Sequence, residues 1–147
     1  MRVALFLHLI SAVVWVGGMF LAYVAVRPAV TEVLDPPQRL RTWVGIFRRF
    51  FLWVWAAVAV ILLSGFAMLG EMPDAPRSAL VMAVVGIVMA GIFFYIFIAP
   101  FSQLRQAVRA EDWQAGAAAL GRIRQLVALN LTLGIINIGV AVLGPMF

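Results

Sequence analysis

Long apolar stretches separated by short polar segments dominate the chain. Four of them contain almost no charged side chains and reach about the ~20 apolar residues that cross a bilayer; they cover residues 3–26, 50–70, 78–100 and 124–146. Strand-like alternation is absent, and backbone groups in lipid must be hydrogen-bonded within their own segment. The pattern predicts an all-α integral membrane bundle of four transmembrane helices, forming a single transmembrane domain over residues 1–147.

The positions of the arginines predict how these helices are oriented. All eleven basic residues are arginine, and nine of them lie between the first and second or the third and fourth stretches: Arg27, Arg39, Arg41, Arg48, Arg49, Arg105, Arg109, Arg122 and Arg124. Basic loops of multi-pass proteins generally remain in the cytoplasm. We therefore expect the N- and C-termini and the Glu71–Arg77 loop to face outward, to the periplasm or the cell exterior.

Local signals mark where helices begin and end. Asp35-Pro36 is typical of a helix start, so residues 37–49 should run as a helix into the second span. Glu111 and Asp112 favour the start of the helix that leads into the fourth span. Pro73 and Pro76 should interrupt the outer loop. Aromatic anchors are expected near the inner boundary of the membrane at Tyr23, Trp43, Trp53, Trp55, Tyr95 and Trp113.

Helical spacing divides each span into an inward and a lipid-facing side. In the first span the inward stripe comprises His8, Ser11, Ala12, Trp15, Met19 and Ala22, and the lipid stripe comprises Phe6, Ile10, Val13, Phe20 and Val24. Shared faces are also expected for Trp53, Ala57, Ser64 and Met68, and for Asn130, Gly134, Asn137 and Ala141. In the third span, Gly86 and Ala90 have the spacing that permits close helix approach.

His8 is the one histidine of the chain, and an ionisable side chain inside a membrane span is costly unless it has a partner or a function. At a rise of ~1.5 Å per residue, His8, Ser64 and Asn137 lie at similar depths in the outer half of the bundle. Ser11 lies one turn deeper. We predict a polar layer at this depth, which serves either interhelical hydrogen bonding alone or the binding of a ligand or metal.

Methionines also gather in the outer half. Met68 and Met72 are four residues apart and should share a helical face. With Met82 and His8 they would form a soft site, because thioethers and imidazole both bind Cu(I). Ordinary packing is the alternative, since methionine fills irregular cores well.

Composition narrows the classes of function. Hydrophobic residues make up 65% of the chain and charged residues 12%, far from the ~25% charged residues of soluble domains. The net charge of +5 is explained by loops facing the cytoplasm, so we expect no nucleic-acid partner. The absence of cysteine excludes thiolate chemistry. No span contains a carboxylate, which argues against a hydrolase and a proton-coupled transporter; we favour a non-enzymatic protein and leave the enzyme class open.

Several segments resemble the copper-resistance D (CopD) family of small membrane proteins. They are His8–Phe20, the run Phe47-Arg-Arg-Phe-Phe, Ser64-Gly65 and Arg122–Asn130. The resemblance implies copper uptake or tolerance across the inner membrane, with His8 as the functional residue. We expect a protein that binds or transports copper with His8 as its principal ligand. The partners expected are the lipid bilayer, a second copy in a homodimer and a periplasmic copper-binding protein.

The first span is also similar to that of the four-helix, haem-dependent protoporphyrinogen oxidases of the HemJ type. The likeness rests on His8, Trp15 and Gly18, followed by Arg27-Pro28. It implies a b-type haem or porphyrin redox protein in which His8 binds the cofactor. With one histidine per chain, the second axial ligand would have to be a methionine or His8 of another copy.

Overall fold

The computed structural model describes residues 1–144, in which helices are joined by short turns. The elements are α1 (Arg2–Ala12), η1 (Val13–Gly17), α2 (Gly18–Leu21), η2 (Ala22–Val26), α3 (Arg27–Val33), α4 (Pro36–Gly70), α5 (Arg77–Ile98), α6 (Pro100–Arg109) and α7 (Trp113–Leu143). Within this range they form four helices long and apolar enough to cross a membrane: Arg2–Val33, Pro36–Gly70, Arg77–Arg109 and Trp113–Leu143. The all-α prediction is confirmed. The last two residues of the fourth predicted span lie outside the described residues.

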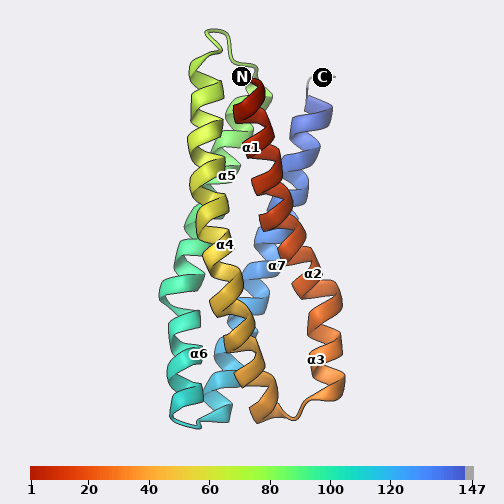
Figure 1. The fold of residues 1–147 in the computed structure, drawn as a ribbon, viewed down its shortest axis with the longest axis vertical. Coiled ribbons are helices and arrows are strands. Elements are labelled where there is room, and N and C mark those ends of the chain that lie inside the picture. The colour runs from red at the N-terminus through yellow and green to blue at the C-terminus, as the bar shows by residue number, and fades with distance from the viewer. Residues whose placement is uncertain (145–147) are drawn as a thin grey trace.

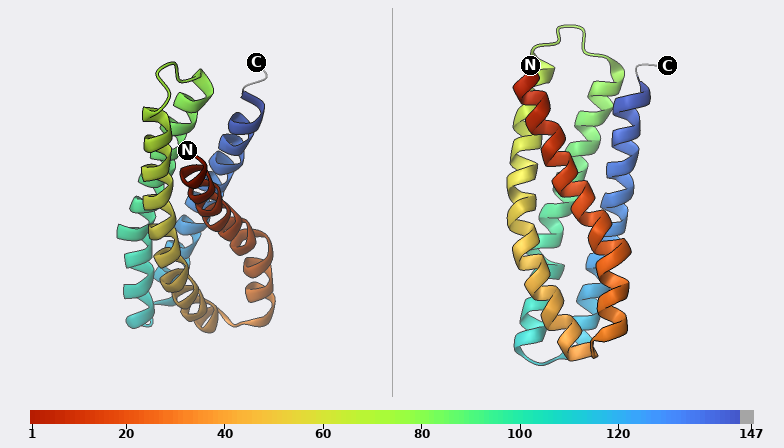
Figure 2. Two further views of the ribbon diagram at one scale, coloured as in Figure 1. Left: turned by 45° about the horizontal axis from the view of Figure 1, so that its top comes forward. Right: turned by 45° about the vertical axis from the view of Figure 1, so that its right-hand side comes forward.

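The four long helices run side by side along the length of the molecule (Figure 1). Met1, the α4–α5 loop and the end of α7 lie at one end, here called the upper end. The α3–α4 and α6–α7 connections lie at the opposite, lower end. The first helix packs on α4 near the upper end and diverges from it toward the lower end (Figure 2). Two segments of this first helix, η1 and η2, have the wider turns of a π-helix.

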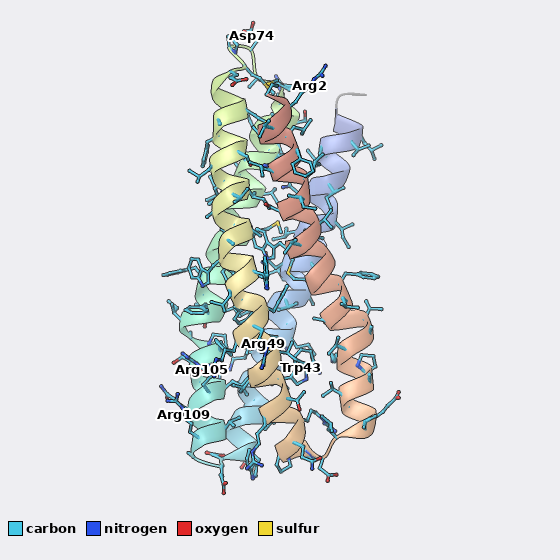
Figure 3. The ribbon with its side chains drawn as sticks, viewed as in Figure 1. Arg2, Trp43, Arg49, Asp74, Arg105 and Arg109 are labelled. Atoms are coloured by element: carbon cyan, nitrogen blue, oxygen red, sulfur yellow. The ribbon has the colours of Figure 1, made fainter. Side chains whose placement is uncertain are left out.

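Charged side chains separate along this axis. Arg105 and Arg109 lie toward the lower end, whereas Arg2 and Asp74 lie at the upper end (Figure 3). The helices are longer than the predicted spans: α4 has 35 residues, or roughly 50 Å at ~1.5 Å per residue, against ~30 Å of hydrocarbon core. Its arginine-bearing first turns therefore extend beyond the length that lipid can cover.

The predicted helix boundaries follow from the residues that cap them. Asp35 precedes α4 with an extended backbone (φ −64°, ψ 154°), and prolines occupy the first turn, where no amide hydrogen is needed. At the start of α7, Asp112 Oδ1 accepts a hydrogen bond from the Ala115 N–H at 3.0 Å. Pro100 ends α5 and begins α6, close to the predicted limit of the third span.

Stacked and edge-on aromatic rings form the core between α4, α5 and α6. Ring centroids lie 5.0 Å apart for Trp43 and Phe47, 5.2 Å for Phe47 and Phe51, and 5.0 Å for Phe51 and Phe101. Phe93 packs against Phe51 at 5.4 Å. Trp43 is therefore a buried core residue, and the prediction that it anchors the membrane boundary is wrong, because its spacing of four from Phe47 puts both on the inward face.

Most predicted faces are confirmed. Ser11, Trp15 and Met19 are buried, while Phe6 and Val13 are exposed. The inward placement of Trp53 is wrong: it is 69% exposed, whereas Val54 beside it is buried. The stripe through Val54 and Ala57 is the inward one, and Trp53 lies about 100° away from Val54 around the helix.

The predicted close approach at Gly86 is also wrong. A Cβ atom placed on Gly86 would meet no atom within 4 Å beyond its own helix. Close packing occurs instead at Gly134, where a Cβ would lie 3.0 Å from Val16 and 3.1 Å from Met89. Gly86 faces a cavity, and the small residue leaves space there.

Candidate functional site

A cavity of about 240 Å³ lies in the upper half of the bundle and is here called the upper cavity. Side chains from α1, α4, α5, α7 and the α4–α5 loop line it. Its polar and sulfur-bearing lining residues are His8, Met68, Met72, Met82 and Asn137, and the remaining lining is apolar. The residues proposed from the sequence as metal ligands thus surround one space.

The imidazole of His8 is held by α4. His8 Nδ1 lies 3.1 Å from Ser64 Oγ, and Ser64 itself donates its hydroxyl hydrogen to the carbonyl oxygens of Val60 and Ile61 one turn earlier. A hydroxyl has a single hydrogen, so when that hydrogen is directed to a backbone carbonyl, Ser64 Oγ is free to accept the hydrogen of Nδ1. In that tautomer the neutral imidazole keeps a lone pair on Nε2.

Gly65 leaves room for that ring. A Cβ on Gly65 would lie 3.2 Å from Cε1 of His8, closer than ordinary van der Waals contact. Ser64 is buried and His8 is half-buried. Ser64 therefore holds the imidazole by a hydrogen bond, and the missing side chain of Gly65 leaves the space that the ring occupies.

Asn137 contributes an amide oxygen on the α7 side. Its Nδ2 donates to the Met82 carbonyl at 3.3 Å, and its Oδ1 is buried without a hydrogen-bond partner among residues 1–144. Seven residues earlier, Asn130 Nδ2 donates to the Met89 carbonyl, also at 3.3 Å. The two asparagines join α5 to α7 by hydrogen bonds to backbone carbonyls.

The three methionines reach the cavity from different parts of the chain. Met68 belongs to α4 and Met82 to α5. Met72 lies beyond the end of α4, just before Pro73, so the prediction that Met68 and Met72 share a helical face is wrong; α4 ends at Gly70. Met19 and Met89 are buried deeper in the core, and Met146 lies outside the described residues.

The predicted polar layer divides into two parts. Ser64 is hydrogen-bonded to His8, and Asn137 lines the same cavity as His8. Ser11 is buried at 6% exposure and is not a lining residue of that cavity. Ser11 lies instead in the packed interior, on the lower side of the upper cavity.

The donor set of the upper cavity is neutral and soft. Within residues 1–144, no three His, Cys, Asp or Glu side chains come close enough to hold a metal ion. The cavity is lined instead by one histidine, three methionines and one asparagine. Thioether and imidazole groups suit Cu(I), whereas Ca²⁺ and Mg²⁺ require carboxylate or carbonyl oxygens.

A cavity that sequence reasoning missed lies in the lower half. It has a volume of about 290 Å³, and its lining includes Arg27, Arg39 and Arg124; we call it the lower cavity. Arg39 Nη2 donates to the carbonyl oxygens of Thr31 at 3.1 Å and Leu34 at 3.2 Å. The sequence does not predict this cluster, because the convergence of these arginines depends on how α3, α4 and α7 face one another.

Comparison with known proteins gives one family. The model of the family described as Copper resistance protein D (CopD) matches residues 44–143, about two thirds of the chain. No curated protein and no solved structure matches the sequence. The matched range includes Ser64, Asn137 and the three methionines of the upper cavity, while His8 precedes it. With four long apolar helices and this match, the chain is a multi-pass membrane protein that belongs to the CopD family.

Proposed function

We propose that the protein binds Cu(I) in the upper cavity and serves copper transport or tolerance at the bacterial inner membrane. The observation that carries the proposal is the convergence of His8, Met68, Met72 and Met82 on one cavity. These side chains come from separate elements, yet they are the soft donors that this metal prefers. Copper is the cargo of this site.

The charge of the cavity supports a monovalent metal. Its lining contains no aspartate or glutamate among the described residues. A divalent ion in such a neutral, low-dielectric site would be left without compensating charge, and the cost of burying an ion grows steeply with its charge. Cu(I) carries one charge, and thioether donors match its softness.

His8 is proposed as the principal ligand, acting through Nε2. Its hydrogen bond to Ser64 fixes the tautomer and the ring orientation, which is the usual role of a group behind a metal-binding histidine. Ser64 is thus a positioning residue.

The orientation follows from the arginines. With the arginine-rich lower end in the cytoplasm, the termini and the upper cavity face the periplasm, where a periplasmic copper-binding protein delivers the metal. The chain acts as one transmembrane domain. A homodimer would give the bundle a second copy of the site and a path between copies.

Anaerobic titration of the purified full-length protein with Cu(I), in competition with a chromophoric chelator, tests the proposal. We expect one Cu(I) per chain, and at least about a tenfold loss of affinity in His8→Ala and Met82→Leu, corresponding to about 1.4 kcal/mol or more. Met19→Leu is the matched control, because Met19 is buried away from the cavity.

Equal copper binding by the wild type and by His8→Ala would overturn the assignment of the ligand. A Soret absorption band that appears on haem supplementation and is lost in His8→Ala would assign the site to a b-type haem instead. A visible spectrum and metal analysis of the same sample therefore distinguish bound copper from bound haem.

A further inference from the structure

The lower cavity is independent of the proposed copper site, and its chemistry is the opposite. Guanidinium groups reach it from three helices: Arg27 of α3, Arg39 of α4 and Arg124 of α7. Its lining contains no acidic side chain within the described chain, and the nearby Glu32 and Asp35 are exposed. Three converging positive charges without a counterion in the protein favour an anionic ligand.

The Arg39 guanidinium group is held by hydrogen bonds, yet not all of its donors are used. Its Nη2 donates to two carbonyl oxygens at the α3–α4 connection. Its Nε is buried and has no acceptor in the part of the chain that the structure describes. A guanidinium group has five N–H donors, so with two of them engaged by carbonyl oxygens this side chain keeps donors for a further acceptor. Planar guanidinium groups bind phosphate oxygens with good geometry.

The rest of the cavity is apolar and aromatic. Leu40, Trp43 and Phe47 of α4 line it, together with Leu120, Ile123 and Val127 of α7. Arg27 also packs over the Tyr23 ring at 5.4 Å, which leaves this guanidinium at the edge of the apolar surface. A ligand that fits has an anionic group at one end and a hydrocarbon part at the other.

We propose that the lower cavity binds a phosphate group, and that an anionic phospholipid supplies it. The phosphate contacts Arg39, Arg27 and Arg124, while an acyl chain lies against the apolar lining. The position at the arginine-rich end matches the leaflet in which anionic lipids attract basic residues. A free phosphate ion shares the chemistry of the headgroup but would leave the apolar lining unused.

Lipid titration of the full-length protein in a neutral detergent tests the proposal. The probes are dilauroyl phosphatidylglycerol, dilauroyl phosphatidylcholine and inorganic phosphate, and the readouts are native mass spectrometry and the thermal unfolding temperature. We expect saturable binding of one phosphatidylglycerol with a raised unfolding temperature. Phosphatidylcholine has the same phosphate but also a quaternary ammonium, whose positive charge the arginines repel, so we expect it to bind about tenfold more weakly.

Two variants and a control locate the site. Arg39→Gln and Arg124→Gln should each weaken phosphatidylglycerol binding by about tenfold. Arg124→Gln is the safer variant, because the Arg124 side chain is exposed, whereas Arg39 holds the α3–α4 connection through its hydrogen bonds to the Thr31 and Leu34 carbonyls. Arg109→Gln is the control: this arginine lies toward the lower end (Figure 3) but does not line the cavity.

Equal binding of the two lipids would overturn the proposal, as would equal losses in Arg124→Gln and Arg109→Gln. Saturation by inorganic phosphate with no preference between the lipids would keep the phosphate site but overturn the lipid as its source. Copper titration of Arg124→Gln should match the wild type, so failure here is distinguishable from failure of the copper site.

Discussion

The upper and lower cavities are of similar size but opposite chemistry. The upper one has about 240 Å³ and presents an imidazole and thioethers, while the lower one has about 290 Å³ and presents guanidinium groups. A metal cation and an anionic headgroup can therefore bind the same bundle at opposite ends. Three arginines line the lower cavity and none lines the upper one, so their positive charge lies away from the proposed metal site.

A packed core separates the two ends. Trp15, Met19 and Met89 are each only 3% exposed, and Trp15 meets Phe93 edge-on with ring centroids 6.4 Å apart. Movement of an ion from one end to the other would require this layer to rearrange. The two cavities should consequently respond independently to substitutions that leave the core intact.

The largest effect is expected from removing an aromatic ring of the core, which should impair both cavities together. Phe51→Ala should destabilise the bundle by about 3–5 kcal/mol, because Phe51 packs against Phe47, Phe93 and Phe101. Both binding activities should fall together. Thermal unfolding in detergent measures the loss, and the exposed neighbour Leu52→Ala should change stability by less than about 0.5 kcal/mol.

Ser64→Ala should affect the upper cavity alone. Loss of the acceptor for His8 Nδ1–H should lower Cu(I) affinity by about 10–100-fold, as for other groups that orient metal ligands. Chelator competition gives the affinity. Ser64→Thr retains the hydroxyl and should recover most of it; if Ser64→Ala binds copper like the wild type, the hydrogen bond does not position the ligand.

Gly65→Ala should shift the imidazole by steric contact rather than by loss of a hydrogen bond. The added methyl group would lie 3.2 Å from His8 Cε1, and we expect about a tenfold weaker Cu(I) affinity with unchanged phosphatidylglycerol binding. Gly70→Ala is the control, because a Cβ there meets no neighbouring atom. Identical copper affinities for the two variants would contradict the proposed position of the metal.

The smallest effect is expected at an exposed ion pair of the lower end. Arg41 Nη2 lies 3.5 Å from Glu111 Oε1, and both side chains are more than half exposed. Glu111→Gln should change the free energy of unfolding by less than about 1 kcal/mol and leave both cavities functional. A larger change in the unfolding temperature would show that charges at this end support the fold as well as a ligand.

The fold was largely predictable because lipid restricts the possibilities. A long uncharged apolar segment must be a helix in a bilayer, and the predicted spans lie within the observed long helices, the fourth of which ends at Leu143. The inward faces were harder to predict for apolar side chains. Trp53 was misplaced because apolar residues occur all around α4, so hydrophobicity did not distinguish lipid from core.

Parts of the upper cavity could be predicted by comparing how deep each residue lies along its transmembrane helix. A constant helical rise put His8 level with Ser64, and the structure joins them by a hydrogen bond. The lower cavity could not be anticipated in that way. Its three arginines converge because of how separate helices are rotated relative to one another. That rotation cannot be deduced from residue spacing along one helix or from counting charges.

The wide turns η1 and η2 allow one helix to serve both cavities. In a regular α-helix, residues four apart drift by about 40° per step, or about 160° over four steps. Yet Ser11, Trp15 and Met19 are buried, and Tyr23 and Arg27 on the same four-residue repeat line the lower cavity. The wider turns absorb the drift. Deleting one residue from each would leave a membrane-spanning helix whose lower half presents a different set of side chains to the bundle.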